Sequence, residues 1–490
     1  MRRFLLLAGI GSLAFGVACG GGNGSGKGSG GGGGSFSNAS LSGQYAYQLS
    51  GLDVVGSFRE AGVFAANGSG TITGGEDDFV QNTSLASATS SGTYTISSNG
   101  TGSITLNMSN GRSLLIAVTL VSTSKIYLVV GQEQVGSSLV AITGAGISLK
   151  QDSSAFTAPP SGTFVFRKHL LNVVQGTSSS EVGTFTIANG TANGSEDVNR
   201  AGVQSSLALS GSFNFPDTSG HGSGTFTDNA GTSTFLYYVV DSNRFFLLST
   251  DTGILGNGQA EKQSATAFSA ASLSGSYAFG SQGDTTLNFA GLNTVGRFTA
   301  DGAGSISSGA MDSVQDGTSS SNISFTGTYT VNAAGKAVVT LNPAGGGTTS
   351  QIFWMVSPSR AVFLTDSASK IEDGTMDLQQ GSSFSNATLS GQYAFVMDGF
   401  DISQNTFDRV GTINWGGSGN LTLDELINFN GQTSTPGSLA GTYTVAANGR
   451  GVASVSTLSN NVVFYLISAN DAYMLQNDTG AEIQGTMSKQ

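Results

Sequence analysis

The sequence predicts an all-β protein with four tandem antiparallel meander domains of about eight strands each, in the form of small up-and-down β-barrels. Short runs of Val, Ile, Leu, Phe and Tyr alternate with turn-forming Gly, Asn, Asp and Ser. The same landmarks recur in four copies, and no stretch shows the 3.6-residue period of a helix. Closing a meander into a barrel removes its two exposed edges. A two-sheet β-sandwich fits the same strand count and is the alternative.

A Gly-x-aromatic-x-aromatic motif opens each repeat, and the four copies lie 113 to 119 residues apart. A Phe precedes each copy, and a Gly-x-x-x-x-Gln motif closes each repeat. The last closing motif ends on Gln490, so we expect the fourth unit to be complete. The opening glycines are Gly43, Gly162, Gly275 and Gly391, the leading aromatics are Phe36, Phe156, Phe268 and Phe384, and the closing glutamines are Gln151, Gln263, Gln379 and Gln490.

A Val-Gly-x-apolar register motif recurs at one position of each repeat and helps to align the four copies. The first unit illustrates the strands that we expect in every repeat. Connections between these strands are too short for crossover helices, which predicts antiparallel neighbours. Asn99-Gly100 is a strong hairpin signal. The glycines of the register motif are Gly56, Gly183, Gly296 and Gly411. The strands expected in the first unit are 44–49, 54–64, 71–73, 93–96, 103–108, 114–121, 126–130 and 140–149.

The N-terminus has the pattern of an export signal. Two arginines follow Met1, and an apolar run over 4–15, too short for a comfortable membrane span, leads to Gly16-Val17-Ala18-Cys19. Cys19 is the only cysteine in the chain, so no disulfide can form within it. Residues 20–34 contain eleven glycines and predict a flexible tether. The predicted divisions are a signal peptide at 1–19, the tether at 20–35, and β-domains at 36–152, 153–264, 265–380 and 381–490.

The segment that ends at Cys19 resembles a bacterial lipoprotein signal, in which the final cysteine receives the lipid. Gly16 stands where that family usually has Leu, and ordinary signal cleavage after Ala18 is the alternative. The whole chain is similar to uncharacterised tandem-repeat lipoproteins of bacteria. This resemblance implies a lipid anchor on Cys19 and export to the cell envelope, at the outer membrane or facing the periplasm.

The opening motif of each repeat weakly resembles that of the lipocalin and avidin-like (calycin) barrels. Those barrels open with a Gly-x-Trp strand whose aromatic plugs the base, and this chain has Tyr or Phe in place of Trp. The resemblance implies a barrel that could hold a small apolar ligand. We expect the equivalent aromatics to fill the core, with ligand binding as the alternative, and they are Tyr45, Phe164, Tyr277 and Tyr393.

Composition and motifs argue against several kinds of chemistry. A net charge of −12 without a basic cluster makes a nucleic-acid partner improbable. The two histidines, His169 and His221, are expected to be incidental surface residues, and no cofactor motif occurs. Acidic residues recur after a glycine turn in each unit, where they could ligate Ca²⁺ but are better explained as turn or solubilising residues. The calcium candidates are Asp77, Asp197, Asp312 and Asp424.

The sequence therefore favours a non-catalytic envelope lipoprotein that presents four β-domains as an interaction or spacer array. Its expected partners are the membrane, through the N-terminal lipid, and a protein. The alternative is a binder of small apolar ligands inside the barrels, and a remote one is an unrecognised hydrolase. An interior filled by aromatics favours the array, whereas an open cup of a few hundred cubic ångströms favours the ligand binder.

Overall fold

A computed structural model of the chain describes residues 35–286, 291–401, 403, 405–455 and 460–490. The predicted signal peptide, Cys19 and residues 20–34 lie outside the described residues. The described part is built from β-strands and four short 3₁₀-helices. No helix in it is long and apolar enough to span a membrane. The 3₁₀-helices are η1 (Asn38–Ser40), η2 (Ser153–Thr157), η3 (Ala270–Ser272) and η4 (Asn386–Thr388).

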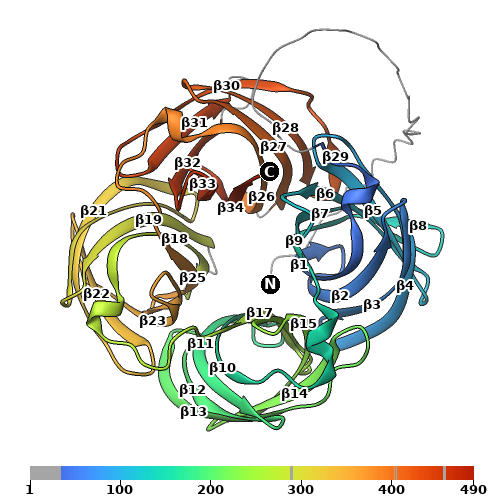
Figure 1. The fold of residues 1–490 in the computed structure, drawn as a ribbon, viewed down its shortest axis with the longest axis horizontal. Helices are drawn as coiled ribbons and strands as arrows, with labels where there is room; N and C mark the ends of the chain where they lie inside the picture. The colour runs from blue at the N-terminus through green and yellow to red at the C-terminus, as the bar shows by residue number, and fades with distance from the viewer. Residues whose placement is uncertain (1–34, 287–290, 402, 404, 456–459) are drawn as a thin grey trace. The chain divides into compact units, whose positions relative to one another are not determined.

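Barrel 1, blue in Figure 1, is a closed antiparallel barrel with one additional strand. β1 pairs with both β2 and β9, and the pairing of β6 with β7 completes the circuit. The short β8 pairs only with β7, outside the circuit. The strands are β1 (Ser42–Asp53), β2 (Ser57–Asn67), β3 (Thr71–Gln81), β4 (Ser84–Ile96), β5 (Thr101–Met108), β6 (Arg112–Leu120), β7 (Lys125–Val135), β8 (Ser138–Val140) and β9 (Ile142–Lys150).

Barrels 2 and 3 are closed circuits of strands in chain order. In each, the first strand pairs antiparallel with the second and with the last. Barrel 2 consists of β10 (Gly162–Asn172), β11 (Thr177–Ala188), β12 (Thr191–Arg200), β13 (Val203–Phe213), β14 (His221–Asp228), β15 (Gly231–Asp241), β16 (Arg244–Ser249) and β17 (Ile254–Lys262). Barrel 3 consists of β18 (Ser274–Thr285), β19 (Gly291–Asp301), β20 (Ser305–Gln315), β21 (Thr318–Val331), β22 (Lys336–Pro343), β23 (Thr349–Ser357), β24 (Arg360–Asp366) and β25 (Lys370–Leu378).

Barrel 4 repeats the plan of barrel 1, with β29 as the additional strand. Its circuit closes through β26 with β34 and through β27 with β28. The predicted fold class, four tandem antiparallel barrels of eight strands, is confirmed, and the β-sandwich alternative is excluded. The strands are β26 (Ser390–Asp401), β27 (Phe407–Gly416), β28 (Asn420–Phe429), β29 (Gln432–Ser434), β30 (Leu439–Val445), β31 (Arg450–Val455), β32 (Asn460–Leu466), β33 (Asp471–Gln476) and β34 (Ala481–Lys489).

Alternate side chains of each strand fill the barrel interiors. In β1, Tyr45, Tyr47 and Leu49 are fully buried in the core of barrel 1, whereas Ala46 faces outward and packs against barrel 2. The core of barrel 2 is the most aromatic, because it is packed with phenylalanine rings whose centroids lie as close as 4.6 Å. These phenylalanines are Phe156, Phe164, Phe166, Phe185, Phe213, Phe226, Phe235 and Phe245.

The structure corrects the register motif in the first unit. Gly183 of β11 lies directly opposite Phe166, and a Cβ atom at this glycine would lie only 2.8 Å from the ring. Glycine at this position therefore leaves room for an inward aromatic ring to lie across the second strand. In barrel 1 the residue opposite Tyr47 is Gly62, not Gly56, which lies in the turn before β2. The apparent Val-Gly match at 55–56 was wrong because the true motif there reads Ala-Gly-Val.

Each barrel packs its first strands against strands six to eight of the next barrel. All described residues belong to one compact unit, and four apolar clusters join barrels 1 and 2, 2 and 3, 3 and 4, and 4 and 1. We call these contacts junctions 1–2, 2–3, 3–4 and 4–1. Junction 4–1 joins Ala394 and Val410 of barrel 4 to Tyr127 and Val129 of barrel 1. The contacts between barrels therefore form a closed cycle.

The closing glutamine of each repeat reaches into the next barrel. Gln379 Nε2 donates to the main-chain carbonyls of Asn448, at 3.2 Å, and Leu466, at 2.7 Å. Gln490 Nε2 donates in the same way to Asn99 and Leu120 of barrel 1, at 3.1 and 2.6 Å. The fourth repeat therefore contacts the first as each other repeat contacts its successor.

Candidate functional site at the barrel junctions

An outward aspartate on the third strand of barrels 1 to 3 forms the polar centre of each junction. At junction 3–4, Asp312 is fully buried and accepts hydrogen bonds from Tyr465 Oη, at 2.6 Å, and from the Arg450 guanidinium, at 2.6 and 2.8 Å. These charge-assisted bonds satisfy the carboxylate on the side that faces barrel 4. The third-strand aspartates are Asp78, Asp197 and Asp312.

Junction 2–3 repeats this arrangement with different donors. Asp197 accepts from Trp354 Nε1 at 2.8 Å and from Lys336 Nζ at 2.5 Å. The side-chain amide nitrogen of Asn199, the next outward residue of the same strand, lies within hydrogen-bond distance of three carbonyl oxygens of barrel 3, at 2.8 to 3.0 Å. Junctions 2–3 and 3–4 therefore each combine an aspartate, an aromatic donor on the sixth strand and a cation on the fifth.

At junction 1–2 the cation is replaced by a histidine. Asp78 accepts from Tyr238 Oη and from Ser87 Oγ, and its Oδ2 lies 3.4 Å from His221 Nε2. The His221 ring stacks on Tyr238 with a centroid distance of 5.1 Å. The side chain of His221 is 25% exposed, so this residue lies within a junction and is not the incidental surface residue that we expected.

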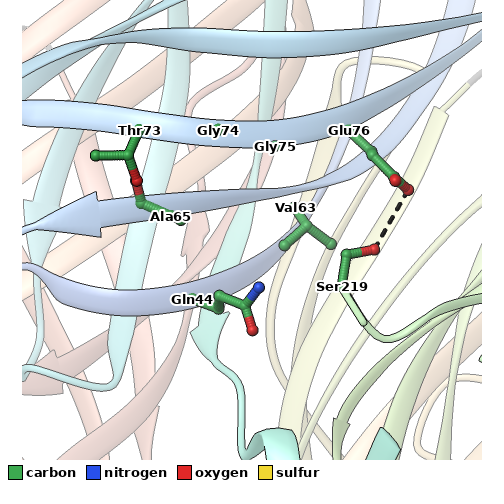
Figure 2. A pocket seen from close by; sticks show the side chains of 8 residues that line it. All are labelled: Gln44, Val63, Ala65, Thr73, Gly74, Gly75, Glu76 and Ser219. Atoms are coloured by element: carbon green, nitrogen blue, oxygen red, sulfur yellow. Dashed lines mark hydrogen bonds between the residues drawn. The ribbon is translucent and has the colours of Figure 1, made fainter. Parts of the chain in front are cut away.

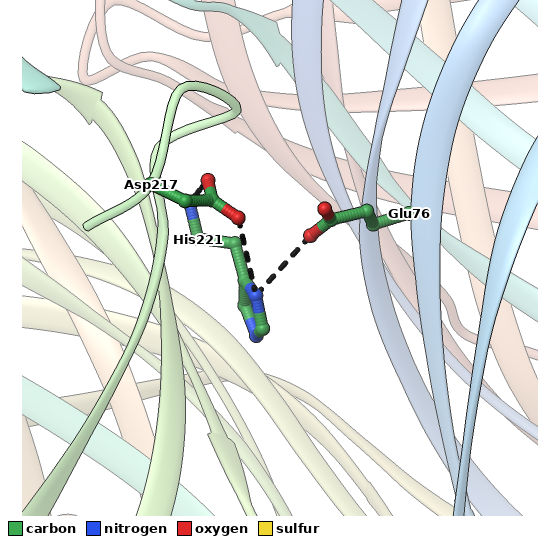
Figure 3. Close-up of side chains that lie close together, drawn as sticks. All are labelled: Glu76, Asp217 and His221. Carbon is green, nitrogen blue, oxygen red and sulfur yellow. Dashed lines mark hydrogen bonds and ion pairs between the residues drawn. The ribbon is translucent and has the colours of Figure 1, made fainter.

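Two further carboxylates approach the other nitrogen of His221, as Figure 3 shows. Glu76 Oε2, from β3 of barrel 1, lies 3.2 Å from Nδ1. Asp217 Oδ2, from the turn before β14, lies 3.9 Å from the same atom. One ligand atom from each of these three residues lies within 4.8 Å of the others, so among the described residues they form a group that could hold a metal ion.

Hydrogen bonds and burial tune the acids of this cluster. Burial raises the pKa of Glu76, and the nearby Asp217 carboxylate raises it further. Burial also acts to raise the pKa of Asp217, but hydrogen bonds from Ser219 outweigh it and lower the pKa. The main-chain N–H of Ser219 lies 2.8 Å from Asp217 Oδ1 and its hydroxyl 2.5 Å. Asp217 is therefore held as an ionised carboxylate beside His221.

A cavity of about 250 Å³, whose lining residues Figure 2 shows, shares Glu76 with the cluster. Strands β1 to β3 of barrel 1 form most of its wall, and Ser219 of barrel 2 closes one side. Ser219 Oγ donates to Glu76 Oε2 at 3.3 Å. The cavity is therefore a feature of the outer face of barrel 1 where barrel 2 meets it. Its lining residues are Gln44, Val63, Ala65, Thr73, Gly74, Gly75, Glu76 and Ser219.

The aromatics of the opening motifs lie inside the barrels. Tyr45 Oη donates to the Thr123 carbonyl at 2.7 Å, and Tyr277 Oη donates to the Pro358 carbonyl at 2.6 Å. Both acceptors lie in the turn between the sixth and seventh strands, and burial raises the pKa of both phenols to about 12. The four opening aromatics are fully buried and are Tyr45, Phe164, Tyr277 and Tyr393.

Side chains leave little free space in the interior of barrel 4. A cavity of about 30 Å³ remains beside Trp415, which is too small for an organic ligand. The polar end of the barrel is occupied by Arg409, which forms a bidentate ion pair with Glu425 at 2.7 and 2.9 Å.

The calcium candidates do not share one position. Asp77 faces the interior of barrel 1, where it accepts from Tyr47 Oη at 2.6 Å and lies 3.4 Å from Arg112. Burial and the neighbouring Glu60 raise the pKa of Asp77 well above its ordinary range. Asp197 and Asp312 face outward, into junctions, and Asp424 lies half-buried on β28 opposite Thr412. A shift of one residue along a strand turns the side chain to the opposite face of the sheet. The four acids were grouped by sequence position alone, and they lie in different surroundings.

The second histidine also lies at a junction. His169 Nδ1 lies 2.7 Å from Asp373 of barrel 3, beside Arg167, and its side chain is 14% exposed. It too is not the surface residue that we expected. Sequence reasoning missed His221, Glu76 and Asp217 as a group, because its alignment of the repeats did not reach the fifth strands. A signal was present, since His221, Lys336 and Arg450 follow equivalent turns.

Comparisons with known proteins identify no family. No protein-family model matches the chain, and a search of curated proteins finds no match. Among solved structures, one similar chain is the intact Ap-TbpB with its N and C lobes, at 8% identity and a TM-score of 0.18, covering 75% of this chain and 84% of that one. Another is a Trp-176-Ala mutant of Transferrin Binding Protein B from Haemophilus parasuis Hp5, at 8% identity and a TM-score of 0.18, covering 74% and 83%. Similarity at this level supports no conclusion about the fold or activity of this chain.

Proposed function

We propose that this chain is a non-catalytic lipoprotein of the cell envelope whose four barrels act as one rigid array for contact with a protein partner or as a spacer. The observation that carries this proposal is the closed cycle of junctions, in which every barrel is fixed by two neighbours. A rigid array offers a preorganised surface, and binding to such a surface costs less ordering entropy than binding to linked, mobile domains.

Exposed apolar residues near one end of barrels 1 and 2 support a role in protein contact. Val54 and Val55 lie between β1 and β2, and Val174 lies in the equivalent connection between β10 and β11. Their exposures are 64%, 62% and 73%. Aliphatic side chains this exposed give a contact surface an apolar anchor.

The filled interiors argue against the two alternatives. A ligand binder of the calycin kind needs an open cup, but aromatic side chains occupy the cores of these barrels. A glycoside hydrolase of the usual kind needs two carboxyl groups across the bond that it cleaves. The 250 Å³ cavity is lined by a single carboxylate, Glu76.

Mass spectrometry of the chain purified from membranes tests the proposal. We expect a diacylglyceryl mass on Cys19 and no stoichiometric small molecule after delipidation. The matched control is Cys19→Ala. We expect this variant to be lost from the membrane fraction and to keep the thermal unfolding profile of the wild type. A stoichiometric apolar ligand that survives delipidation would favour the binder, and an unmodified Cys19 in membrane-bound protein would contradict the anchor.

A further inference from the structure

At three positions junction 1–2 carries a His, Asp or Glu where junctions 2–3 and 3–4 have other residues, and each of the three could ligate a metal. The fifth-strand cation, Lys336 or Arg450 in the other junctions, is His221 here, and the turn residue four positions before it, Asn332 or Ala446, is Asp217. The third-strand residue two positions before the aspartate, Ser195 or Ala310, is Glu76.

These changes leave junction 1–2 short of positive charge. At junction 3–4 one carboxylate, Asp312, meets one permanent cation, Arg450. At junction 1–2 three carboxylates, those of Glu76, Asp78 and Asp217, surround a single imidazole. Among the described residues, no other cationic side chain pairs with any of the three. A divalent cation would offset this excess of negative charge, whereas a neutral histidine would not.

The distances between the donor atoms suit a small tetrahedral ion. Zn²⁺ binds His nitrogen and carboxylate oxygen at about 2.0–2.2 Å, which places neighbouring ligand atoms about 3.4 Å apart. His221 Nδ1 lies 3.2 Å from Glu76 Oε2 and 3.9 Å from Asp217 Oδ2, on either side of that value. Three protein ligands leave one tetrahedral position open.

The surroundings hold these donors in the orientation that a metal needs. Asp78 lies on the Nε2 side of the imidazole, 3.4 Å away, so Nδ1 is the nitrogen that faces Glu76 and Asp217. Asp217 Oδ1 accepts from the N–H groups of Ser219 and His221, which leaves Oδ2 facing the cluster. Stacking on Tyr238 fixes the plane of the His221 ring.

We propose that Glu76, Asp217 and His221 bind a divalent transition-metal ion of the Zn²⁺ class, which links barrels 1 and 2. Glu76 comes from barrel 1 and the other two ligands from barrel 2, so the ion ties the two barrels together. The proposal is independent of the proposed contact function.

Titration of the metal-free full chain with Zn²⁺ at pH 7.5 tests the site. We expect one saturable equivalent in isothermal titration calorimetry, together with a rise in the unfolding temperature that depends on Zn²⁺ concentration. The key variant is His221→Lys, which restores the residue type of junction 2–3 and therefore preserves the fold. It should lose the calorimetric signal and the Zn²⁺-dependent rise while unfolding normally without metal.

Matched variants separate the site from other metal binding. Glu76→Ser and Asp217→Asn, which copy junction 2–3, should each weaken Zn²⁺ binding at least tenfold. His169→Ala removes the only other histidine and should leave the binding isotherm unchanged. The proposal is overturned if the wild type shows no saturable equivalent, or if His221→Lys binds Zn²⁺ as the wild type does. In the second case the His221 cluster is a simple ion-pair network.

Discussion

Junctions 3–4 and 4–1 use equivalent strands but opposite chemistry. At junction 3–4 the third strand presents Asp312, which bonds to Tyr465 and Arg450. At junction 4–1 the equivalent of Asp312 is Leu426, which packs against the apolar cluster of that junction. The positions of Tyr465 and Arg450 are taken there by Thr119 and Thr101. A polar contact remains at the next outward residue of the same strand, Asn428, whose Nδ2 donates to the Val130 and Ile142 carbonyls at 2.6 and 2.8 Å.

The difference shows which contacts the fold requires. The aspartate with its cation is absent from one junction, so barrels can associate without it. The closing glutamine, in contrast, bonds to two carbonyls at all four junctions. We infer that the glutamine contact defines the register between barrels and that the aspartate cluster adjusts the strength of each junction.

The largest expected effect comes from Asp312→Ala at junction 3–4. The change leaves the Arg450 guanidinium and the Tyr465 hydroxyl without their buried acceptor, which costs about 3–5 kcal/mol. Hydrogen exchange of the β32 amides should accelerate accordingly. Leu426→Ala at junction 4–1 is the matched control and should cost only about 1–2 kcal/mol, because that side chain is half-buried. Equal losses would mean that the charged cluster does not strengthen junction 3–4.

Loss of the glutamine contact should matter most at junction 4–1, because its two barrels are not consecutive in the strand order. Gln490→Ala removes the two hydrogen bonds donated to the Asn99 and Leu120 carbonyls, of which Asn99 still accepts from Gln392 Nε2 at 3.1 Å, and this loss costs about 1–3 kcal/mol. Faster exchange of the β6 amides measures this loss. Gln379→Ala removes the same two bonds at junction 3–4, where the continuous chain keeps the barrels at a high effective concentration. Similar exchange in both variants would contradict this difference.

Junction 4–1 should also weaken as the pH rises. Burial raises the pKa of Asp398 to about 6, from an ordinary value of 3.8, and the Arg59 charge offsets this only in part. Burial likewise raises the pKa of Asp408, which lies next to barrel 1. At these two carboxyls the folded chain therefore binds more protons than the unfolded chain between about pH 4 and 6, so their contribution to stability falls over that window.

For Asp398 the expected loss from pH 4 to pH 7 is about 1–2 kcal/mol, reduced by partial solvent access. Asp398→Asn should flatten this part of the profile, as measured by thermal unfolding at each pH. The control is a substitution that involves no titratable group, Thr422→Ser at an exposed position of β28, and it should leave the profile unchanged. If wild type and Asp398→Asn have the same slope from pH 4 to 7, the Asp398 carboxyl is not held in a buried state.

The smallest change in unfolding free energy should come from introducing the charged cluster of junction 3–4 at junction 4–1, which lacks it. The triple variant Leu426→Asp, Thr119→Tyr and Thr101→Arg gives junction 4–1 the residues of junction 3–4. A buried ion pair often contributes little over the apolar contact that it replaces, so we expect a change in unfolding free energy within about 1–2 kcal/mol. Leu426→Asp alone should be clearly worse, since its charge lacks partners. If the triple variant is no better than the single one, the equivalence of the two junctions fails.

The strand pattern of the sequence predicted the barrels, because alternation records which side chains face the core. The strand prediction was wrong over 74–92, where β3 and β4 extend well beyond the expected strands. That hairpin is rich in Gly, Ser, Thr and Asp, and the first residues of β4 are exposed, so no apolar alternation marks it. Main-chain pairing extends these strands, and a few side chains support it: Phe79 packs against Phe58, and Val80 belongs to the apolar cluster of junction 1–2.

The junctions could not be predicted, because the contacts of outward residues depend on which barrels meet. Asp78 and Tyr238 are 160 residues apart and bond only because barrel 2 packs on the first strands of barrel 1. The closing glutamines were recognised as a landmark. The sequence of one repeat, however, does not indicate that this side chain donates hydrogen bonds to the next barrel. A comparison of all four copies of the fifth strand would have revealed the exchange of His for Lys or Arg.

The closed cycle of junctions has a consequence for proteolysis. A protease that cuts one connection between barrels converts the chain into two pieces, yet each piece still holds the other through two junctions. Release of a fragment requires both junctions to open together, which is far rarer than the opening of either one. A nicked chain should therefore run as two bands in denaturing gels and as one species in solution.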